Sequence, residues 1–219
     1  SVTINEDSSL DLVGVNTANS ADVDSVAGVS DSGAVSVDVA GLLDVSGTSI
    51  ALGSGTSVFN TGSLTFSSSG SVTINEDSSL DLVGVNTAGS ADLDSVAGVS
   101  DAGAASVDVS GLLDVSGTSI ALGSGVTVFN TGTLTFNSAG SVTVSEASSL
   151  DLVAANTAGN ANLNSAAGVS DAAAASVDVT GLLDVSGSSI ALGSGASVFN
   201  AGTMTFSSAG SVTISEDSS

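Results

Sequence analysis

Aspartate and glutamate are the only residues of this chain that could do charged chemistry. The 219 residues include 23 acids but no Lys, Arg, His or Cys, so the formal net charge is −23. Nucleic-acid binding needs cationic side chains that replace counterions on phosphate, and zinc sites nearly always use Cys or His. A P-loop lysine and a Ser-His-Asp triad are equally excluded. Carboxylates, hydroxyls, amides and backbone groups remain.

Calcium suits these remaining groups, because it binds carboxylate and carbonyl oxygens. The candidate ligands are Asp22, Asp24 and Asp31 and, 70 positions later, Asp92, Asp94 and Asp101. No EF-hand or glycine-rich nonapeptide surrounds them. The third copy of the pattern has Asn162 and Asn164 in place of the first pair, and Ala147 where positions 7 and 77 are Asp. The alternative is a solvated acidic face that prevents lateral association.

An enzyme is not expected. Paired carboxylates can hydrolyse glycosidic bonds, but here most of the acids recur from copy to copy of the pattern, which indicates a surface and not a site. No cofactor is expected to be required, although calcium remains a candidate ligand. The Thr-x-Thr segments 133–135 and 203–205 resemble an ice-binding array, but they lie 70 positions apart and the first copy has Ser63.

A 70-residue repeat fills the chain. SVTINEDSSLDLVGVNTA begins at Ser1 and again at Ser71, SVTVSEASSLDLVAANTA begins at Ser141, and SVTISEDSS begins at Ser211. The modules are therefore 1–70, 71–140 and 141–210, with a partial fourth module at 211–219. No Pro and no long polar linker separates them. Such a fixed period predicts one continuous array of stacked units over residues 1–219.

Short segments with apolar residues at alternate positions predict β-strands. In the first module they are 1–4, 10–13, 21–24, 35–39, 42–45, 49–52, 56–59 and 63–66, with a less regular stretch near 16–32. The fold class is therefore all-β, a parallel β-helix (β-solenoid) with about three coils per module. About 23 residues per coil would give a rod roughly 45 Å long. Residues 171–175 are expected to form a turn, because two of the three copies have Gly there.

The alternation also predicts which side chains face the core. The inward residues are Val2, Ile4, Leu10, Leu12, Val23, Val37, Val39, Leu43, Val45, Ile50, Leu52, Val58, Leu64 and Phe66. The outward residues are Thr3, Asp11, Asp22, Asp24, Ser36, Asp38, Asp44, Ser49 and Thr65. The six Phe are expected in the core. Asn16, Asn60 and their equivalents are expected at corners, because Asn tolerates left-handed backbone.

The segments GSVTINEDSSLDLVGVNTA, SVDVAGLLDVSGTSIALGSG and FNTGSLTFSSSGSVTI resemble the repeats of filamentous-haemagglutinin-like adhesins and related autotransporter passengers. The resemblance covers the whole chain but lies in composition and rhythm, with no catalytic motif. It implies a right-handed parallel β-helix, export across a Gram-negative envelope, and a role in adhesion or surface architecture. The lack of every basic residue, the lack of a secretion domain and the regular period depart from that family.

These observations predict a structural segment of an extracellular or cell-surface β-solenoid, as an adhesin stalk or a self-assembling filament. The expected partners are copies of itself end-to-end, or flanking repeats of a longer chain, together with divalent cations. Nucleic acid is not expected as a partner. Membrane insertion is not expected either, because no run of 18 apolar residues is present. The alternative function is a calcium-dependent binding module.

Overall fold

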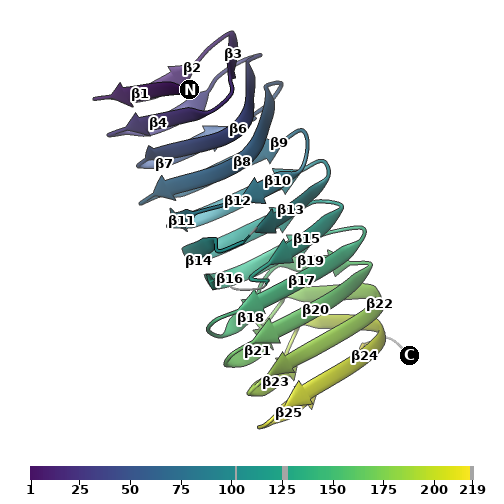
Figure 1. The fold of residues 1–219 in the computed structure, drawn as a ribbon. Helices are drawn as coiled ribbons and strands as arrows, with labels where there is room; N and C mark the ends of the chain where they lie inside the picture. The colour runs from purple at the N-terminus through teal and green to yellow at the C-terminus, as the bar shows by residue number, and fades with distance from the viewer. Residues whose placement is uncertain (102, 125–127, 218–219) are drawn as a thin grey trace.

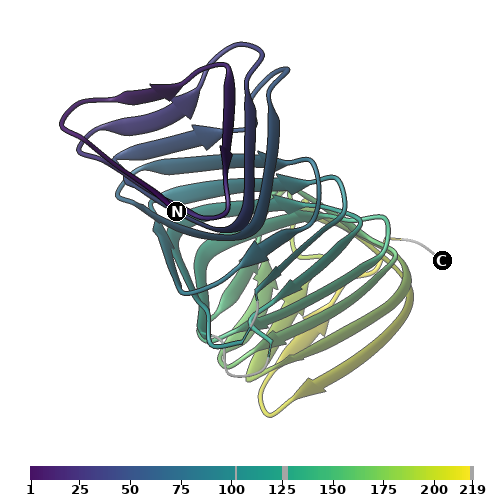
Figure 2. The ribbon, with the colours of Figure 1, turned by 45° about the horizontal axis from the view of Figure 1, so that its top comes forward.

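The structure, a computed structural model, describes residues 1–101, 103–124 and 128–217. These residues wind into one parallel β-solenoid, with the two ends of the chain at opposite ends of the rod (Figures 1 and 2). Each turn takes about 21 residues, and there are about ten turns. The predicted all-β parallel β-solenoid is therefore confirmed, with turns slightly shorter than the 23 residues expected.

The strands recur in the same order in each module. The first module holds β1 (Val2–Glu6), β2 (Leu10–Leu12), β3 (Val15–Ala18), β4 (Ala21–Ser25), β5 (Gly28–Asp31), β6 (Ser36–Gly47), β7 (Ser49–Leu52) and β8 (Val58–Ser68). The second holds β9 (Ser71–Glu76), β10 (Leu80–Leu82), β11 (Val85–Ala88), β12 (Ser90–Ser95), β13 (Gly98–Asp101), β14 (Ser106–Ser116), β15 (Ser119–Leu122) and β16 (Val128–Asn137). The third holds β17 (Ser141–Glu146), β18 (Leu150–Leu152), β19 (Ala155–Ala158), β20 (Asn160–Ser165), β21 (Gly168–Asp171), β22 (Ser176–Gly187), β23 (Ser189–Leu192) and β24 (Val198–Ser208), and β25 (Val212–Ile214) follows.

Successive turns stack in register through parallel backbone pairing. Val2 pairs with Ala21, Ala21 with Leu43, and Leu43 with Leu64. The long strands β6 and β8 bend where the pairing register shifts, between Val39 and Leu42. At the equivalent corner of β8, a Cβ on Gly62 would lie 2.4 Å from the carbonyl oxygen of Ala40. Only glycine allows the two corners to approach so closely.

Consecutive modules are rotated about the rod axis. At about 21 residues per turn, 70 residues make about three and one third turns. The strand β9, which is equivalent to β1, therefore stacks in the row formed by β2, β5 and β7. In the same way β17 stacks in the row of β10, β13 and β15. Equivalent side chains of adjacent modules thus do not stack on one another.

The core is a continuous column of aliphatic side chains with phenylalanines among them. Most of the predicted inward residues are buried, and Phe59, Phe66, Phe129, Phe136 and Phe199 have no exposed surface. The inward position predicted for Val58 was wrong, because this side chain is 45% exposed. Phe59 and Thr61 face inward from the same strand. Two strands of the irregular stretch, β3 and β5, were not predicted. The pattern there is interrupted by small and polar residues, so the two-residue alternation is weak.

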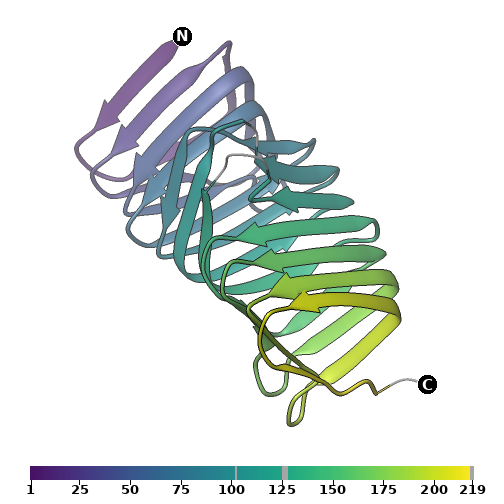
Figure 3. The same cartoon turned by 60° about the horizontal axis from the view of Figure 1, so that its bottom comes forward.

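The two ends of the core are less covered than its middle. Val2 is 42% exposed at the first turn, and Phe206 is 56% exposed at the last long strand. Figure 3 shows the last turn, formed by β24 and β25, at the end of the rod. The predicted burial of Val2 and Phe206 is therefore wrong in this structure, because no described residue lies over them.

The third module carries two strained alanines. Ala154 has a positive φ of 54° at the position of Gly14 and Gly84. Ala174 has a positive φ of 72° and lies one residue after the position of Gly33 and Gly103, which have positive φ in the same turn of the first two modules. A non-glycine residue in this conformation costs about 1–2 kcal/mol. The expected turn after Asp171 is confirmed, since Ala174 adopts the glycine conformation and does not continue a helix.

Candidate functional site

The outer surface carries rows of aspartates. Strand pairing places Asp22 of β4 directly beside Asp44 of β6, with Asp24 two residues along the same strand. The same arrangement joins Asp92 to Asp114 in the second module. We call these residues and their third-module equivalents the acidic rows. In the third module the position beside Asp184 is Asn162.

The acidic rows are electrostatically unfavourable. Burial raises the pKa of Asp44, and repulsion from Asp22 and Asp24 raises it further. Burial likewise raises the pKa of Asp92, with Asp94 and Asp114 adding to the effect. Since the sequence contains no Lys, Arg or His, no cationic side chain offsets this repulsion. Hydroxyls provide some relief, as where the Ser46 Oγ donates to Asp24 Oδ1 at 2.5 Å.

The six predicted calcium ligands fall into two groups. Asp22, Asp24 and their equivalents lie on the outer surface of β4 and β12. Asp31 is only 2% exposed, and it accepts hydrogen bonds from the backbone N–H groups of Gly53 at 2.8 Å and Ser54 at 3.3 Å. Asp101 is buried in the same way and accepts from the Gly123 N–H at 2.6 Å. These two aspartates therefore support the backbone of a neighbouring corner.

Calcium binding by Asp22, Asp24, Asp31, Asp92, Asp94 and Asp101 stays a prediction. Within the residues described, no three His, Cys, Asp or Glu side chains are grouped so that they could hold a metal ion.

The threonine pairs also do not form a repeated flat array. Thr135 is only 6% exposed, and Thr133 and Thr203 lie on strands of different modules, which are rotated relative to each other.

A second set of polar residues ties each module to the one before it. We call Glu76, Asp77 and Asn86 the junction residues of the second module. Glu76 is 2% exposed and accepts hydrogen bonds from the Thr61 N–H at 3.1 and 3.2 Å and from the Ser78 Oγ at 2.8 Å. Asp77 Oδ2 accepts from the Phe59 N–H at 3.0 Å. In this part of β8 a carboxylate replaces the carbonyl that strand pairing would supply.

Asn86 connects three successive turns and has no exposed surface. Its Oδ1 accepts from the Phe66 N–H at 3.0 Å, while its Nδ2 donates to the carbonyl oxygens of Val83 at 2.9 Å and Ser106 at 3.4 Å. Asn156 makes the same three contacts one module later. Asn16 and its equivalents were expected only to form corners, but Asn86 also bonds the turns before and after its own. Asn60 lies inside β8, so its predicted place at a corner was wrong.

The buried junction glutamates have raised pKa values. Burial raises the pKa of Glu76 to about 7, hydrogen bonds from Ser78 and Thr61 oppose this rise, and repulsion from Asp77 adds to it. Burial also raises the pKa of Glu146, with a smaller contribution from Asp108. Sequence reasoning did not single out these glutamates. The available signal was a Glu at a fixed position of every module, where the strand alternation places it inward.

Comparison with known proteins gives no relative. No family model, no curated protein and no solved structure matches the chain. No helix among the described residues is long and apolar enough to cross a bilayer. What is shown is the fold, a parallel β-solenoid of about ten turns, with acidic rows outside and junction residues inside.

The substitution Asn86→Ala should destabilise the rod strongly. It leaves the buried Phe66 N–H without its acceptor, which costs about 1–3 kcal/mol. It also removes the hydrogen bonds to the Val83 and Ser106 carbonyls, at about 0.5–1.5 kcal/mol each, although the Val83 carbonyl still accepts from Thr65 Oγ1. We expect the free energy of unfolding to fall by about 2–4 kcal/mol. The matched control is Asn16→Ala, because Asn16 is less buried and its Nδ2 donates only to the Val13 carbonyl at 3.3 Å. Equal urea midpoints for the two variants would contradict the role assigned to Asn86.

Stability should rise as the pH falls below 7. The folded chain holds the Glu76 proton up to about pH 7, whereas the unfolded chain releases it near the ordinary value of 4.5. The contribution of Glu76 is therefore complete below pH 4.5 and lost as the pH rises through 7. After allowance for solvent screening, we expect about 1–2 kcal/mol from this group.

Thermal unfolding of the parent chain and of Glu76→Gln between pH 4.5 and 8 measures this dependence. The variant should show the shallower slope, because glutamine still accepts from the Thr61 N–H but does not ionise. Glu6→Gln is the control, since Glu6 occupies the same module position but, among the described residues, its side chain bonds only Ser8 of its own segment. Parallel profiles for the parent and Glu76→Gln would rule out the effect.

Proposed function

We propose that this chain is a structural segment of an extracellular or cell-surface β-solenoid, serving as the stalk of an adhesin or as part of a filament. The observation that carries the proposal is the continuous sheet, in which pairing runs through every module boundary. One example is the pairing of β7 with β9, and another is that of β15 with β17. A rod of this kind is extended and stiff, because each module stacks directly on the next. Each added module lengthens the rod without adding a flexible linker.

Resistance to proteolysis supports a place outside the cell. The chain offers no Lys or Arg to trypsin-type proteases. Five of its six phenylalanines have no exposed surface, so chymotrypsin-type proteases cannot reach them in the folded rod. The outward acids keep neighbouring rods apart, because a large net charge of one sign opposes association. The resemblance to filamentous-haemagglutinin-like repeats supports the same location.

Labelling of intact cells tests this proposal. An antibody raised against the folded chain should label unpermeabilised cells of the source organism or their released material. Chymotrypsin should cut the folded rod no earlier in the chain than the exposed Phe206, until urea unfolds the rod and exposes the other five phenylalanines. Labelling that appears only after lysis, with none in the medium, would overturn the extracellular role.

The acidic rows support a second candidate function, a calcium-dependent binding module. The observation in its favour is the side-by-side placement of Asp22 and Asp44, and of Asp92 and Asp114, with no cationic side chain to offset them. A divalent cation would relieve the repulsion that raises the pKa of Asp44. Carboxylate oxygens are ligands that calcium prefers.

Calorimetry with calcium chloride, against sodium chloride at equal ionic strength, tests the binding function. Binding by the acidic rows predicts heat above the ionic-strength effect, and a reduction of that heat in Asp44→Asn and Asp114→Asn. Asp184→Asn is the matched control, because its neighbour in the row is Asn162 and not an aspartate. No excess heat with calcium, or an equal loss in all three variants, would exclude specific binding by these rows.

A further inference from the structure

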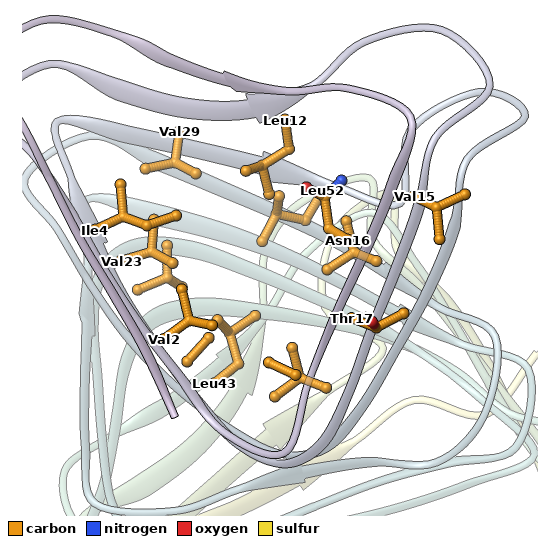
Figure 4. Close-up of a pocket in the computed structure, with 15 residues that line it drawn as sticks. Val2, Ile4, Leu12, Val15, Asn16, Thr17, Val23, Val29, Leu43 and Leu52 are labelled. Carbon is orange, nitrogen blue, oxygen red and sulfur yellow. The ribbon is translucent and has the colours of Figure 1, made fainter.

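The two ends of the rod expose apolar surface that is covered at every internal module boundary. At the first turn an open cavity of about 330 Å³ exposes the core, with Val2, Ile4 and Leu12 around its mouth (Figure 4). The equivalent residues Val72, Ile74 and Leu82 are at most 1% exposed. At the other end Phe206 is 56% exposed, whereas Phe66 has no exposed surface.

The internal boundaries show what covers these surfaces. Residues 80–88 of the second module lie against β8 of the first, through the pairs Leu82 with Leu64 and Thr87 with Ser67. Asn86 then accepts from the Phe66 N–H. The third module repeats this arrangement on β16, where Asn156 accepts from the Phe136 N–H at 3.1 Å. A module start therefore fits a module end in one defined register.

The ends of the rod carry the same two complementary parts. Residues 10–18 have the same sequence as residues 80–88, and no described residue donates to the Oδ1 of Asn16. The strand β24 has Phe206 at the position of Phe66 and Phe136. The first turn thus presents the Asn16 Oδ1 acceptor, and the last turn presents the Phe206 ring and N–H. At both internal boundaries an equivalent Asn accepts from the N–H of an equivalent Phe.

We propose that a second copy of this chain binds end-to-end, with its residues 10–18 covering β24 of the first copy and its Asn16 accepting from the Phe206 N–H. This inference deepens the proposed structural function and rests on it. The contact is heterologous and does not close on itself, so repeated binding builds a filament. Each copy adds about ten turns, or roughly 48 Å, to its length.

One nine-residue segment must leave for this contact to form. Internally, the single segment 71–79 pairs upstream with β7 and downstream with β12. Between two copies, residues 211–217 of one and the terminal segment 1–9 of the other compete for that place, and their matching positions differ only at Asn5 and Ser215. Glu216 and Asp217 already accept from the N–H groups of Ala201 at 3.1 Å and Phe199 at 2.9 Å. The side chains of Glu6 and Asp7 accept from no described backbone N–H of another turn, so we assign residues 1–9 as the segment displaced. The pairing of β1 with β4 is then replaced by pairing of β4 with β25 of the other copy.

Sedimentation velocity and negative-stain imaging of the 219-residue chain over a wide range of concentration test the proposal. The parent should form end-to-end polymers that lengthen with concentration. Phe206→Asp should raise the dissociation constant between two copies about tenfold or more, because it places a carboxylate where the second copy would cover the phenyl ring. Val96→Asp is the matched control: Val96 is 69% exposed on the side of the rod, so this variant should polymerise as the parent does.

Deletion of residues 1–9 should promote assembly, because it removes the competing segment. Circular dichroism establishes that each variant is folded. A parent that stays monomeric at all concentrations would overturn the proposal, and so would polymers that are lost in Val96→Asp but kept in Phe206→Asp. A folded deletion variant that assembles less than the parent would overturn the exchange. A monomer found on the surface of intact cells would refute end-to-end binding while leaving the structural function in place.

Discussion

Backbone hydrogen bonding between turns is the constraint on which the rest of this structure depends. A β-strand makes no backbone hydrogen bonds within itself. In a solenoid, the N–H and C=O groups of each strand must therefore find their partners on the turn above or below. The flat strands meet this requirement by parallel pairing. Where a strand has no paired strand beside it, Asp31, Glu76 and Asn86 supply oxygens to the backbone donors of an adjacent turn. The buried polar side chains are therefore a consequence of the turn geometry.

This constraint explains how a chain without cations can bury carboxylates. A buried charge normally needs an opposite charge or several hydrogen bonds. Glu76 has only hydrogen bonds, from Thr61 and Ser78, and its pKa rises to about 7 because they do not fully replace the lost hydration. A neutral, protonated Glu76 can still accept from the Thr61 N–H. The raised pKa therefore reduces the negative charge that Glu76 carries near neutral pH, so that the buried site needs no basic side chain beside it.

The sequence was sufficient for the fold class because the repeat and the alternation report the same property, the stacking of short strands. It was also sufficient for most inward residues, such as Leu43 and Ile50, which lie in clear alternations. It failed at Val58, because Val58 and its neighbour Phe59 were both expected in the core, whereas successive side chains of a strand point to opposite faces. The junction role of Asn86 could not be predicted, since it depends on which residues of other turns lie above and below it. That depends on the turn length, and 21 residues in place of 23 changes every such neighbour.

The length of the module relative to the turn decides how charge is distributed on the rod. Because 70 residues do not make a whole number of turns, the acidic pair Asp22 and Asp44 and its equivalent Asp92 and Asp114 lie in different rows. If the module were a whole number of turns, equivalent aspartates would stack along one face and concentrate the repulsion there. Rotation spreads the charge around the rod, so that the sides repel other rods in several directions. The ends differ, since Val2 and Phe206 expose apolar core there. In the filament proposed above, lateral repulsion combined with apolar ends would favour contact along the axis over contact between sides, which is the directional bias that a thin fibre requires.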